Sequence, residues 1–320
     1  MSTVYISAKL PDVAGNILDK AGLDYDVYDG QGLITKDELL KHVGDSEILI
    51  TPLSTQVDKD VIDAAPNLKL IANFGAGVNN IDTAYARQKG IDVTNTPAVS
   101  SPATAEIACG LIIALSRRIV EGDQLMRTKG FDGWAPLFFL GQELGGKTLG
   151  IVGLGSIGQM VAERMKAFNM KIIYTQRHQL PAAVENHYGA TFMPLDDLLK
   201  QSDVVTLHCP LTPETKHMID ADQIKEMKSS ALLINCARGP VINEAAVLTA
   251  LQNHELGGAA LDVYEKEPEV DDGFKQLKNV ILTPHIGNAS VQARDGMGKI
   301  VADNAVAVHS GRTPQFVVNK

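Results

Sequence analysis

The chain has few cysteines, and their spacing is not that of a metal site. Its 320 residues include three, Cys109, Cys209 and Cys236, which lie far apart in the sequence. They lack the paired spacing of a zinc site, so we expect no metal centre and interpret them as small, buried apolar side chains. Such sparse cysteine usage favours a reducing compartment.

The chain also lacks an excess of positive charge and any long apolar run. Its net charge of -9 at pH 7 leaves no basic face for the phosphates of nucleic acid or anionic lipid. The longest apolar run, at 107–115, is too short to span a bilayer. No basic segment leads into an apolar stretch near the N-terminus. We therefore predict a cytoplasmic protein that binds neither nucleic acid nor membrane and acts on a small molecule.

What the chain does have is the patterning of a two-domain α/β protein. It is longer than one typical domain. Its 45% hydrophobic and 21% charged residues exclude a disordered or fibrous chain. Short apolar runs alternate with amphipathic stretches, which is the pattern of βαβ units in parallel sheets. A first series of predicted strands lies at 4–7, 25–28, 47–51, 68–74 and 92–96. A second series lies at 148–153, 171–175, 203–208, 231–236, 258–263 and 279–284.

Two long helical patterns indicate how the chain is divided. Residues 100–122 begin with serines and a proline and then run apolar at helical spacing, so we predict a helix that leads from one domain into the other. A second helical pattern covers 289–311, and the tail after it is too short to form a domain. We predict a substrate domain of residues 1–99 and 289–320 around an inserted cofactor domain of residues 100–288.

The segment GLGSIG lies between a predicted strand and an amphipathic helix. Its glycines Gly153, Gly155 and Gly158 allow a sharp turn and a close approach of the backbone to a phosphate, with helix N-terminal amides aimed at it. An isolated glycine pattern of this kind is also found in plain turns. The strand before it and the second strand after the helix favour a dinucleotide site. The predicted loop contacts are Gly153, Leu154, Gly155, Ser156, Ile157 and Gly158.

The end of that second strand distinguishes between the two nicotinamide dinucleotides. An NAD site usually has an acidic residue here, which binds the ribose hydroxyls. This chain has Gln176 and Arg177 instead, and no carboxylate before Glu185. A guanidinium binds a 2′-phosphate with two hydrogen bonds, so we predict NADP(H) in preference to NAD(H). The alternative is that Arg177 only stacks on adenine or faces solvent.

Three polar residues follow predicted strands of the second series. Arg238 can hold a carboxylate with two parallel hydrogen bonds. His285 can give a proton to a carbonyl oxygen during hydride transfer, and a carboxylate partner would favour its charged form. Spacing alone leaves the partner open among Glu265, Glu267 and Glu269. A surface salt bridge for Arg238 and a structural role for His285 are the plainer alternatives.

The motifs together resemble one family. The segments FGAGVNNID, GLGSIG, HCPLTPET, INCARGPVINE, GAALDVYEKEP and LTPHIGNAS occur in the order found in the D-isomer-specific 2-hydroxyacid dehydrogenases. Within that family the chain is most similar to the glyoxylate/hydroxypyruvate reductases. The resemblance implies that Arg238, Glu267 and His285 are the catalytic residues, with Glu267 chosen because it directly precedes the proline. It also implies two Rossmann-like, doubly wound parallel-sheet domains, the first flavodoxin-like, with the active-site cleft between them, usually in a homodimer.

The same resemblance implies further binding residues. Asp262 is expected beside the nicotinamide. The other residues expected near the cofactor are Thr104, Pro210, Thr215, Cys236, Ala237 and Gly287. The amides of Ala76 and Gly77 are expected to bind the substrate carboxylate, as Arg238 does, and His285 is expected to bind the substrate at its carbonyl oxygen. Leu53 is expected to form a wall of the pocket.

The predicted reaction is the reduction of a small 2-oxo acid, of the glyoxylate or hydroxypyruvate type, to the D-2-hydroxy acid. One alternative is the same chemistry with NADH on a bulkier acid such as phenylpyruvate. A protein of another class, a dinucleotide-sensing module in transcriptional corepression, shares the same three residues. That alternative predicts an added surface or tail for a partner, and the chain shows neither.

Overall fold

The computed structural model describes residues 3–320 and divides into two compact units. The first unit comprises Met1–Ser100 and Ala289–Lys320, and the second comprises Ser101–Asn288. Ser100, where the first stretch of the first unit ends, lies one residue beyond the boundary at residue 99 that the sequence predicts. The C-terminal segment belongs to the same unit as the N-terminal part of the chain, and the second unit is inserted between them in the sequence.

The first unit is built on one parallel sheet. Its strands are β1 (Val4–Ile6), β2 (Tyr25–Val27), β3 (Ile48–Pro52), β4 (Leu70–Phe74) and β5 (Asp92–Thr94). Their order in the sheet is β2-β1-β3-β4-β5, which is the flavodoxin-like order. All five pair in parallel, so their carboxyl ends lie at one edge.

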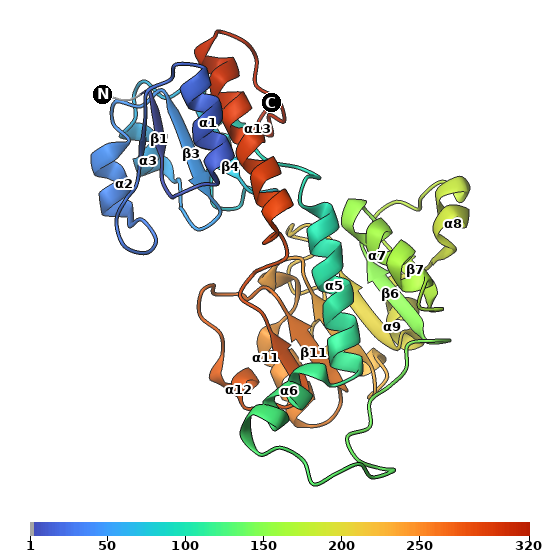
Figure 1. The fold of residues 1–320 in the computed structure, drawn as a ribbon. Helices are drawn as coiled ribbons and strands as arrows, with labels where there is room; N and C mark the ends of the chain where they lie inside the picture. The colour runs from blue at the N-terminus through green and yellow to red at the C-terminus, as the bar shows by residue number, and fades with distance from the viewer. Residues whose placement is uncertain (1–2) are drawn as a thin grey trace. The chain divides into compact units, whose positions relative to one another are not determined.

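Helices cover both faces of this sheet because successive strand residues point to opposite sides. Ile48 and Ile50 pack with α1 (Asp12–Lys20) and α13 (Val291–His309), which lie side by side in Figure 1. Leu49, between them, packs toward the other helices. Those are α2 (Lys36–His42), α3 (Lys59–Asp63) and α4 (Thr83–Gln88).

The second unit contains a larger parallel sheet. Its strands are β6 (Thr148–Val152), β7 (Lys171–Thr175), β8 (Ala190–Phe192), β9 (Val204–Leu207), β10 (Leu232–Asn235), β11 (Gly258–Leu261) and β12 (Val280–Leu282). The order β12-β11-β10-β9-β6-β7-β8 reverses direction at β6. Open sheets of this kind bind ligands beyond the carboxyl ends of the strands, next to such a reversal. The predicted doubly wound α/β class is confirmed.

Two layers of helices enclose this sheet as well. On one face lie α5 (Ser101–Ser116), α7 (Ser156–Lys166) and α8 (Ala182–Tyr188), with α5 and α7 in contact over the sheet (Figure 1). On the other lie α9 (Leu195–Gln201), α10 (Ala221–Glu226) and α11 (Glu244–Gln252). Shorter elements, η1 (Gly239–Val241) and α12 (Asp272–Lys275), follow β10 and β11.

The helix predicted over 100–122 is broken in the structure. α5 ends at Ser116, and Arg118 has a φ of 53°, in the left-handed region that ends a helix. A separate helix, α6 (Ile119–Thr128), follows and buries none of its residues. Within residues 3–320, no helix is long and apolar enough to cross a membrane.

Candidate active site

The three polar residues predicted to be catalytic follow three neighbouring strands of the second unit. Arg238 follows β10, Glu267 lies in the loop after β11, and His285 follows β12. These strands are adjacent and parallel, so their carboxyl ends meet at one edge. This is the edge at which open α/β sheets bind ligands.

Glu267 and His285 form a direct pair. Oε2 of Glu267 lies 2.8 Å from Nδ1 of His285, and Oε1 accepts a hydrogen bond from the amide of Tyr264 over 3.1 Å. Burial by itself raises the pKa of Glu267. The hydrogen bond and charge of His285, the Tyr264 amide and the charge of Arg238 outweigh burial and hold that pKa below its usual value. Glu267 is therefore an anion that can orient and stabilise a protonated imidazole.

Arg238 lies beside this pair with most of its hydrogen-bonding capacity uncommitted. Its Nη1 donates to the carbonyl of Ala237 over 2.7 Å, and no other hydrogen bond or ion pair of its side chain occurs within residues 3–320. Burial lowers its pKa, while the charge of Glu267 acts in the opposite direction. A guanidinium carries five N–H donors and stays charged in proteins. The remaining donors suit the planar carboxylate of an acid.

Asp262 organises the loop that carries His285. Its Oδ1 accepts from Thr283 Oγ1 over 2.6 Å and from the amide of Ile286 over 2.8 Å. Its Oδ2 accepts from the amide of Gly287 over 2.8 Å. The main chain on both sides of His285 is thereby tied to the end of β11. The contact of Asp262 with a nicotinamide stays a prediction.

The glycine loop between β6 and α7 has the geometry that a dinucleotide pyrophosphate requires. Gly153 has a φ of 95°, and a Cβ there would lie 2.9 Å from the main chain of His208 and Cys209. A Cβ on Gly155 would meet no atom within 4 Å, so the space above it is open. No side chain caps the start of α7, which leaves its first amides as donors. The residues present fit the phosphates of a dinucleotide.

The two residues at the end of β7 have different surroundings. The side chain of Gln176 is used by the protein itself, because Oε1 accepts from the amide of Leu154 and Nε2 donates to the carbonyl of His178. Arg177 is exposed and forms no ion pair within 4 Å among the described residues. Gln176 therefore braces the glycine loop, whereas the exposed Arg177 interacts with Glu214 through its charge.

Other predicted cofactor residues lie at the same edge of the sheet or close to it. Thr215 Oγ1 donates to the carbonyl of Pro210 over 2.7 Å and accepts from the amide of Thr212, which closes the loop after β9. Cys236 and Ala237 are buried just beyond β10. A Cβ on Gly287 would lie 3.3 Å from Thr104, so these two predicted residues are neighbours.

The first unit holds the residues predicted to bind the substrate carboxylate. The carbonyls of Gly75, Ala76 and Gly77 are tied back by Thr96, Asn95 and Asn73, respectively. Among residues 3–320, no acceptor takes the amides of Ala76 and Gly77. Successive free amides of this kind suit an anion. Leu53 packs against Gly75, so it adjoins this loop as predicted.

Some residues that shape these loops were not predicted from the sequence. Asn73 and Asn95 bind carbonyls at close range, although nothing in their spacing marks them. His208 accepts from or donates to Thr206 Oγ1 over 2.9 Å, and burial lowers its pKa to about 4. No group of three or more histidine, cysteine, aspartate or glutamate side chains suited to a metal occurs in the described part of the chain.

Comparison with known proteins gives a consistent result. A family model for the D-isomer specific 2-hydroxyacid dehydrogenase, NAD binding domain, matches residues 109–287. A protein of Staphylococcus haemolyticus named as a 2-hydroxyacid dehydrogenase is 53% identical over 320 residues, which is 100% of both chains.

Solved structures agree over the whole chain. The NADPH-dependent glyoxylate/hydroxypyruvate reductase of Sinorhizobium meliloti has a TM-score of 0.83 and 30% identity, covering 98% of this chain and 96% of its own. The D-lactate dehydrogenase of Escherichia coli has a TM-score of 0.84 and 29% identity, covering 99% of each chain. The resemblance recognised from the motifs is confirmed. The chain therefore belongs to the D-isomer specific 2-hydroxyacid dehydrogenases, oxidoreductases that use a nicotinamide dinucleotide.

Proposed function

We propose that this enzyme reduces a small 2-oxo acid, of the glyoxylate or hydroxypyruvate type, to the D-2-hydroxy acid with NADPH. The observation that carries the proposal is the 2.8 Å contact between His285 and Glu267 beside the uncommitted guanidinium of Arg238. A proton donor and a carboxylate anchor at one sheet edge match the two polar ends of a 2-oxo acid.

The roles of the three residues follow from their atoms. Arg238 binds the substrate carboxylate and orients the carbonyl. Because Nδ1 of His285 faces Glu267, Nε2 is the nitrogen that gives a proton to the carbonyl oxygen. When bound, the nicotinamide supplies a hydride to the carbonyl carbon. Glu267 stabilises the charged imidazole before the transfer, and solvent returns the proton to His285 afterwards.

The glycine loop and the end of β7 would hold the dinucleotide. The amides that begin α7 bind the pyrophosphate, and Arg177 binds the 2′-phosphate that distinguishes NADPH from NADH. The NADPH dependence named for the Sinorhizobium meliloti relative supports this assignment. Reduction is the favoured direction with NADPH as the donor.

A second candidate is the same reaction with NADH on another 2-oxo acid. The family model is named for NAD binding, and a D-lactate dehydrogenase is structurally as similar as the glyoxylate reductase. A bulkier acid such as phenylpyruvate would then be the substrate. The cofactor and the acid must therefore be tested separately.

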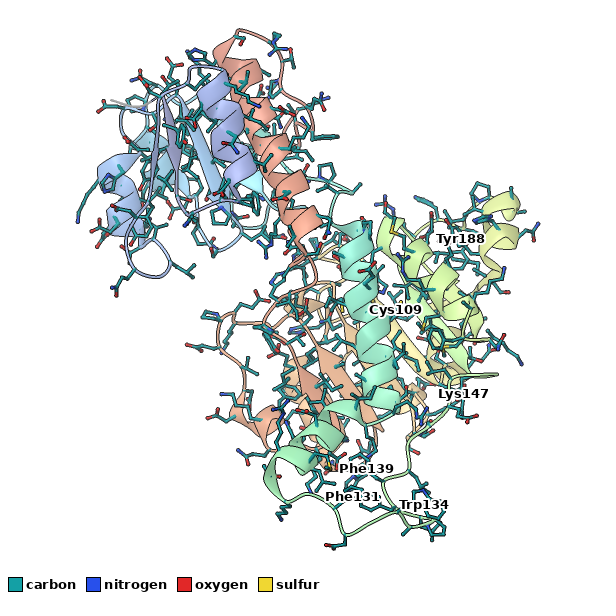
Figure 2. The ribbon with its side chains drawn as sticks, viewed as in Figure 1. Cys109, Phe131, Trp134, Phe139, Lys147 and Tyr188 are labelled. Atoms are coloured by element: carbon teal, nitrogen blue, oxygen red, sulfur yellow. The ribbon has the colours of Figure 1, made fainter. Side chains whose placement is uncertain are left out.

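We further propose that the enzyme is a homodimer joined through an arm formed by residues 129–142. Trp134 and Leu137 are each 84% exposed, and Phe131 is 52% exposed in the same segment. Figure 2 labels Phe131 and Trp134 in this segment. Contiguous exposed apolar side chains of this kind mark contact surfaces.

The base of the arm is fixed while these apolar side chains face outward. Arg118 lies 4.1 Å from the ring of Phe139, donates to the carbonyl of Leu140 over 3.2 Å, and pairs with Glu121 at 2.8 Å. A second copy of the chain, with its own arm, is the partner that we propose for this surface.

The cytoplasmic location stays a prediction.

Substitution of His285 and Arg238 tests the proposed roles. His285→Ala removes the proton donor, so we expect kcat for 2-oxo acid reduction to fall by about 100-fold or more. Arg238→Ala should raise KM and lower kcat together. Both variants should still bind NADPH, measured by fluorescence titration. His254→Ala, at an exposed histidine of the same unit, is the matched control. Near wild-type rates in the His285 variant would exclude it as the donor.

A further inference from the structure

A second pair of carboxylates lies beside Glu267 and His285. Glu244 is the first residue of α11, and Glu265 lies in the loop that also carries Glu267. The amide of Glu244 donates to Oε1 of Glu265 over 3.0 Å. The amide of Glu265 donates to Oε1 of Glu244 over 2.6 Å. Each side chain thus holds the main chain of the other, and two segments 21 residues apart are joined by a closed pair of hydrogen bonds.

We call this closed pair of hydrogen bonds the Glu244–Glu265 clamp. Its side on α11 is itself held by further hydrogen bonds. Asn243 caps α11 by accepting from the amide of Ala246 over 3.2 Å, and its Nδ2 donates to Asp220 over 3.0 Å. Asp220 in turn caps α10. The amide of Glu244 belongs to the first turn, where no carbonyl of the helix can accept it, and a carboxylate at this position is favoured by the helix dipole. Glu265 is therefore tied to a rigid part of the second unit.

The loop side of the clamp leads directly to His285. The amide of Tyr264, the residue before Glu265, donates to Oε1 of Glu267 over 3.1 Å. Oε2 of Glu267 then lies 2.8 Å from Nδ1 of His285. A continuous chain of contacts thus runs from the start of α11 through the main chain at 264–265 to the imidazole. A Cβ on Gly239 would overlap the main chain of Tyr264, so the segment after Arg238 packs on the same two residues.

The charges at the clamp make it an unfavourable arrangement for stability alone. Burial raises the pKa of Glu244, and the amide of Glu265 acts against this effect. The negative charges of Glu265, Asp271 and Glu267 raise that pKa further. His217 lies 3.2 Å from Glu265 on the other side and is the nearest group that can offset this charge. Half-buried carboxylates that repel one another are characteristic of functional sites.

We propose that Glu244 and Glu265 are positioning residues that hold the carboxylate of Glu267 against His285. The inference rests on the proposed function, in which His285 is the proton donor. In this proposal both residues act through the main chain at Tyr264 and not on the reacting atoms. When the clamp opens, Glu267 departs from Nδ1 for part of the time, and the charged imidazole loses stabilisation. The other charged groups around the pair, Arg238 and Asp262, are unchanged by substitutions at 244 and 265.

Alanine and glutamine substitutions separate position from charge. Glu265→Ala and Glu244→Ala each remove an acceptor oxygen, whereas Glu265→Gln and Glu244→Gln keep that oxygen and remove only the negative charge. With the full-length enzyme and NADPH, we expect the alanine variants to lose reduction activity at a lower pH than wild type. At pH 8 their kcat/KM should fall by about tenfold, a part of what general acid catalysis contributes. The glutamine variants should recover most of that loss.

Two further measurements complete the test. In NMR spectra recorded without substrate, the proton on Nδ1 of His285, which faces Glu267, should exchange faster with water in the alanine variants and slow again in the glutamine variants. Glu255→Ala, at an exposed carboxylate just after α11, should change neither the pH profile of activity nor this exchange rate. Circular dichroism verifies the fold, and Glu244→Ala serves if Glu265→Ala does not fold.

Each outcome bears on one of the two proposals. Alanine variants with the wild-type pH profile of activity and the wild-type exchange rate of the Nδ1 proton would overturn the clamp. Glutamine variants as impaired as the alanine ones would also overturn it, because charge and not position would then be responsible. If the wild-type enzyme reduces no 2-oxo acid but the Nδ1 proton still exchanges faster in the alanine variants, the clamp stands and the proposed function fails.

Discussion

Single residues carry the chemical distinctions in this enzyme, and Arg177 is the one that we expect to distinguish the two dinucleotides. It lies just beyond β7, exposed, at the position where an NAD site usually has an acidic residue. Its neighbour Gln176 is occupied with the main chain of Leu154 and His178. Arg177 is therefore the cation at this edge that is available to a 2′-phosphate.

Arg177→Ala should weaken NADPH binding and leave NADH binding unchanged. Charge-assisted hydrogen bonds contribute about 1.5–3 kcal/mol, so we expect Kd for NADPH to rise by roughly 10-fold to 100-fold. Fluorescence titration with each dinucleotide measures both constants, and Arg127→Ala, at another exposed arginine, is the control. An unaltered ratio of the two constants would show that Arg177 does not bind the phosphate.

The glutamate that pairs with His285 could not be predicted from residue spacing. Three glutamates, Glu265, Glu267 and Glu269, lie in one loop, and spacing alone did not select among them. In the structure Glu267 contacts His285, Glu265 contacts the start of α11, and Glu269 contacts neither through its side chain. The course of a loop depends on main-chain hydrogen bonds that the pattern of residue types does not encode.

At the scale of elements, strands were predicted best where both sheet faces are covered. A buried parallel strand reads as a continuous apolar run, and β3, β4, β6, β7, β10 and β11 were all found this way. The edge strand β8 was missed because, of its three residues, only Ala190 is fully buried. The break between α5 and α6 was also missed, since the left-handed Arg118 has no signal in residue type.

Helix α7 packs closely against the loop after β6, and one added methyl group would prevent this contact. A Cβ on Gly158 would clash with the carbonyl oxygen of Gly153, which is main chain and cannot move aside. Gly158→Ala should therefore separate α7 from the loop after β6 and abolish measurable binding of either dinucleotide. Gly110→Ala in α5, where an added Cβ would meet no atom within 4 Å, is the matched control outside the loop.

Calorimetric titration of both variants with NADPH and NADH measures this effect. We expect a much larger loss of dinucleotide affinity for Gly158→Ala than for Gly110→Ala, with both variants shown to be folded by circular dichroism. Equal affinities of the two variants for NADPH and NADH would contradict the close contact between α7 and the loop after β6.

At the scale of the whole molecule, the sequence predicts a domain of residues 1–99 and 289–320 around an inserted domain of residues 100–288, and the structure divides into Met1–Ser100 with Ala289–Lys320 and Ser101–Asn288. The residue pattern did not predict which surface joins two copies of the chain. In the structure the ring of Phe139 lies against Arg118 at the base of the arm. Trp134 and Leu137 point to an interface instead, since both are 84% exposed.

Changing these two side chains should alter assembly without altering the fold. Trp134→Ser with Leu137→Ser removes the two most exposed apolar groups of the arm, so the dimer should dissociate at concentrations where wild type remains intact. Analytical ultracentrifugation measures the mass, and Val291→Ser, which changes a 72% exposed residue in the first unit, is the control. A monomeric wild type, or a double variant with unchanged mass, would refute the proposed interface.

The central claim is that the site at Arg238, Glu267 and His285 reduces a small 2-oxo acid with NADPH. The most direct measurement is the steady-state oxidation of NADPH and of NADH, followed by absorbance, with glyoxylate, hydroxypyruvate, pyruvate and phenylpyruvate. We expect the highest kcat/KM with NADPH and either glyoxylate or hydroxypyruvate. Turnover restricted to NADH and phenylpyruvate would contradict the proposed cofactor and substrate, and no turnover with any pair would contradict the claim itself.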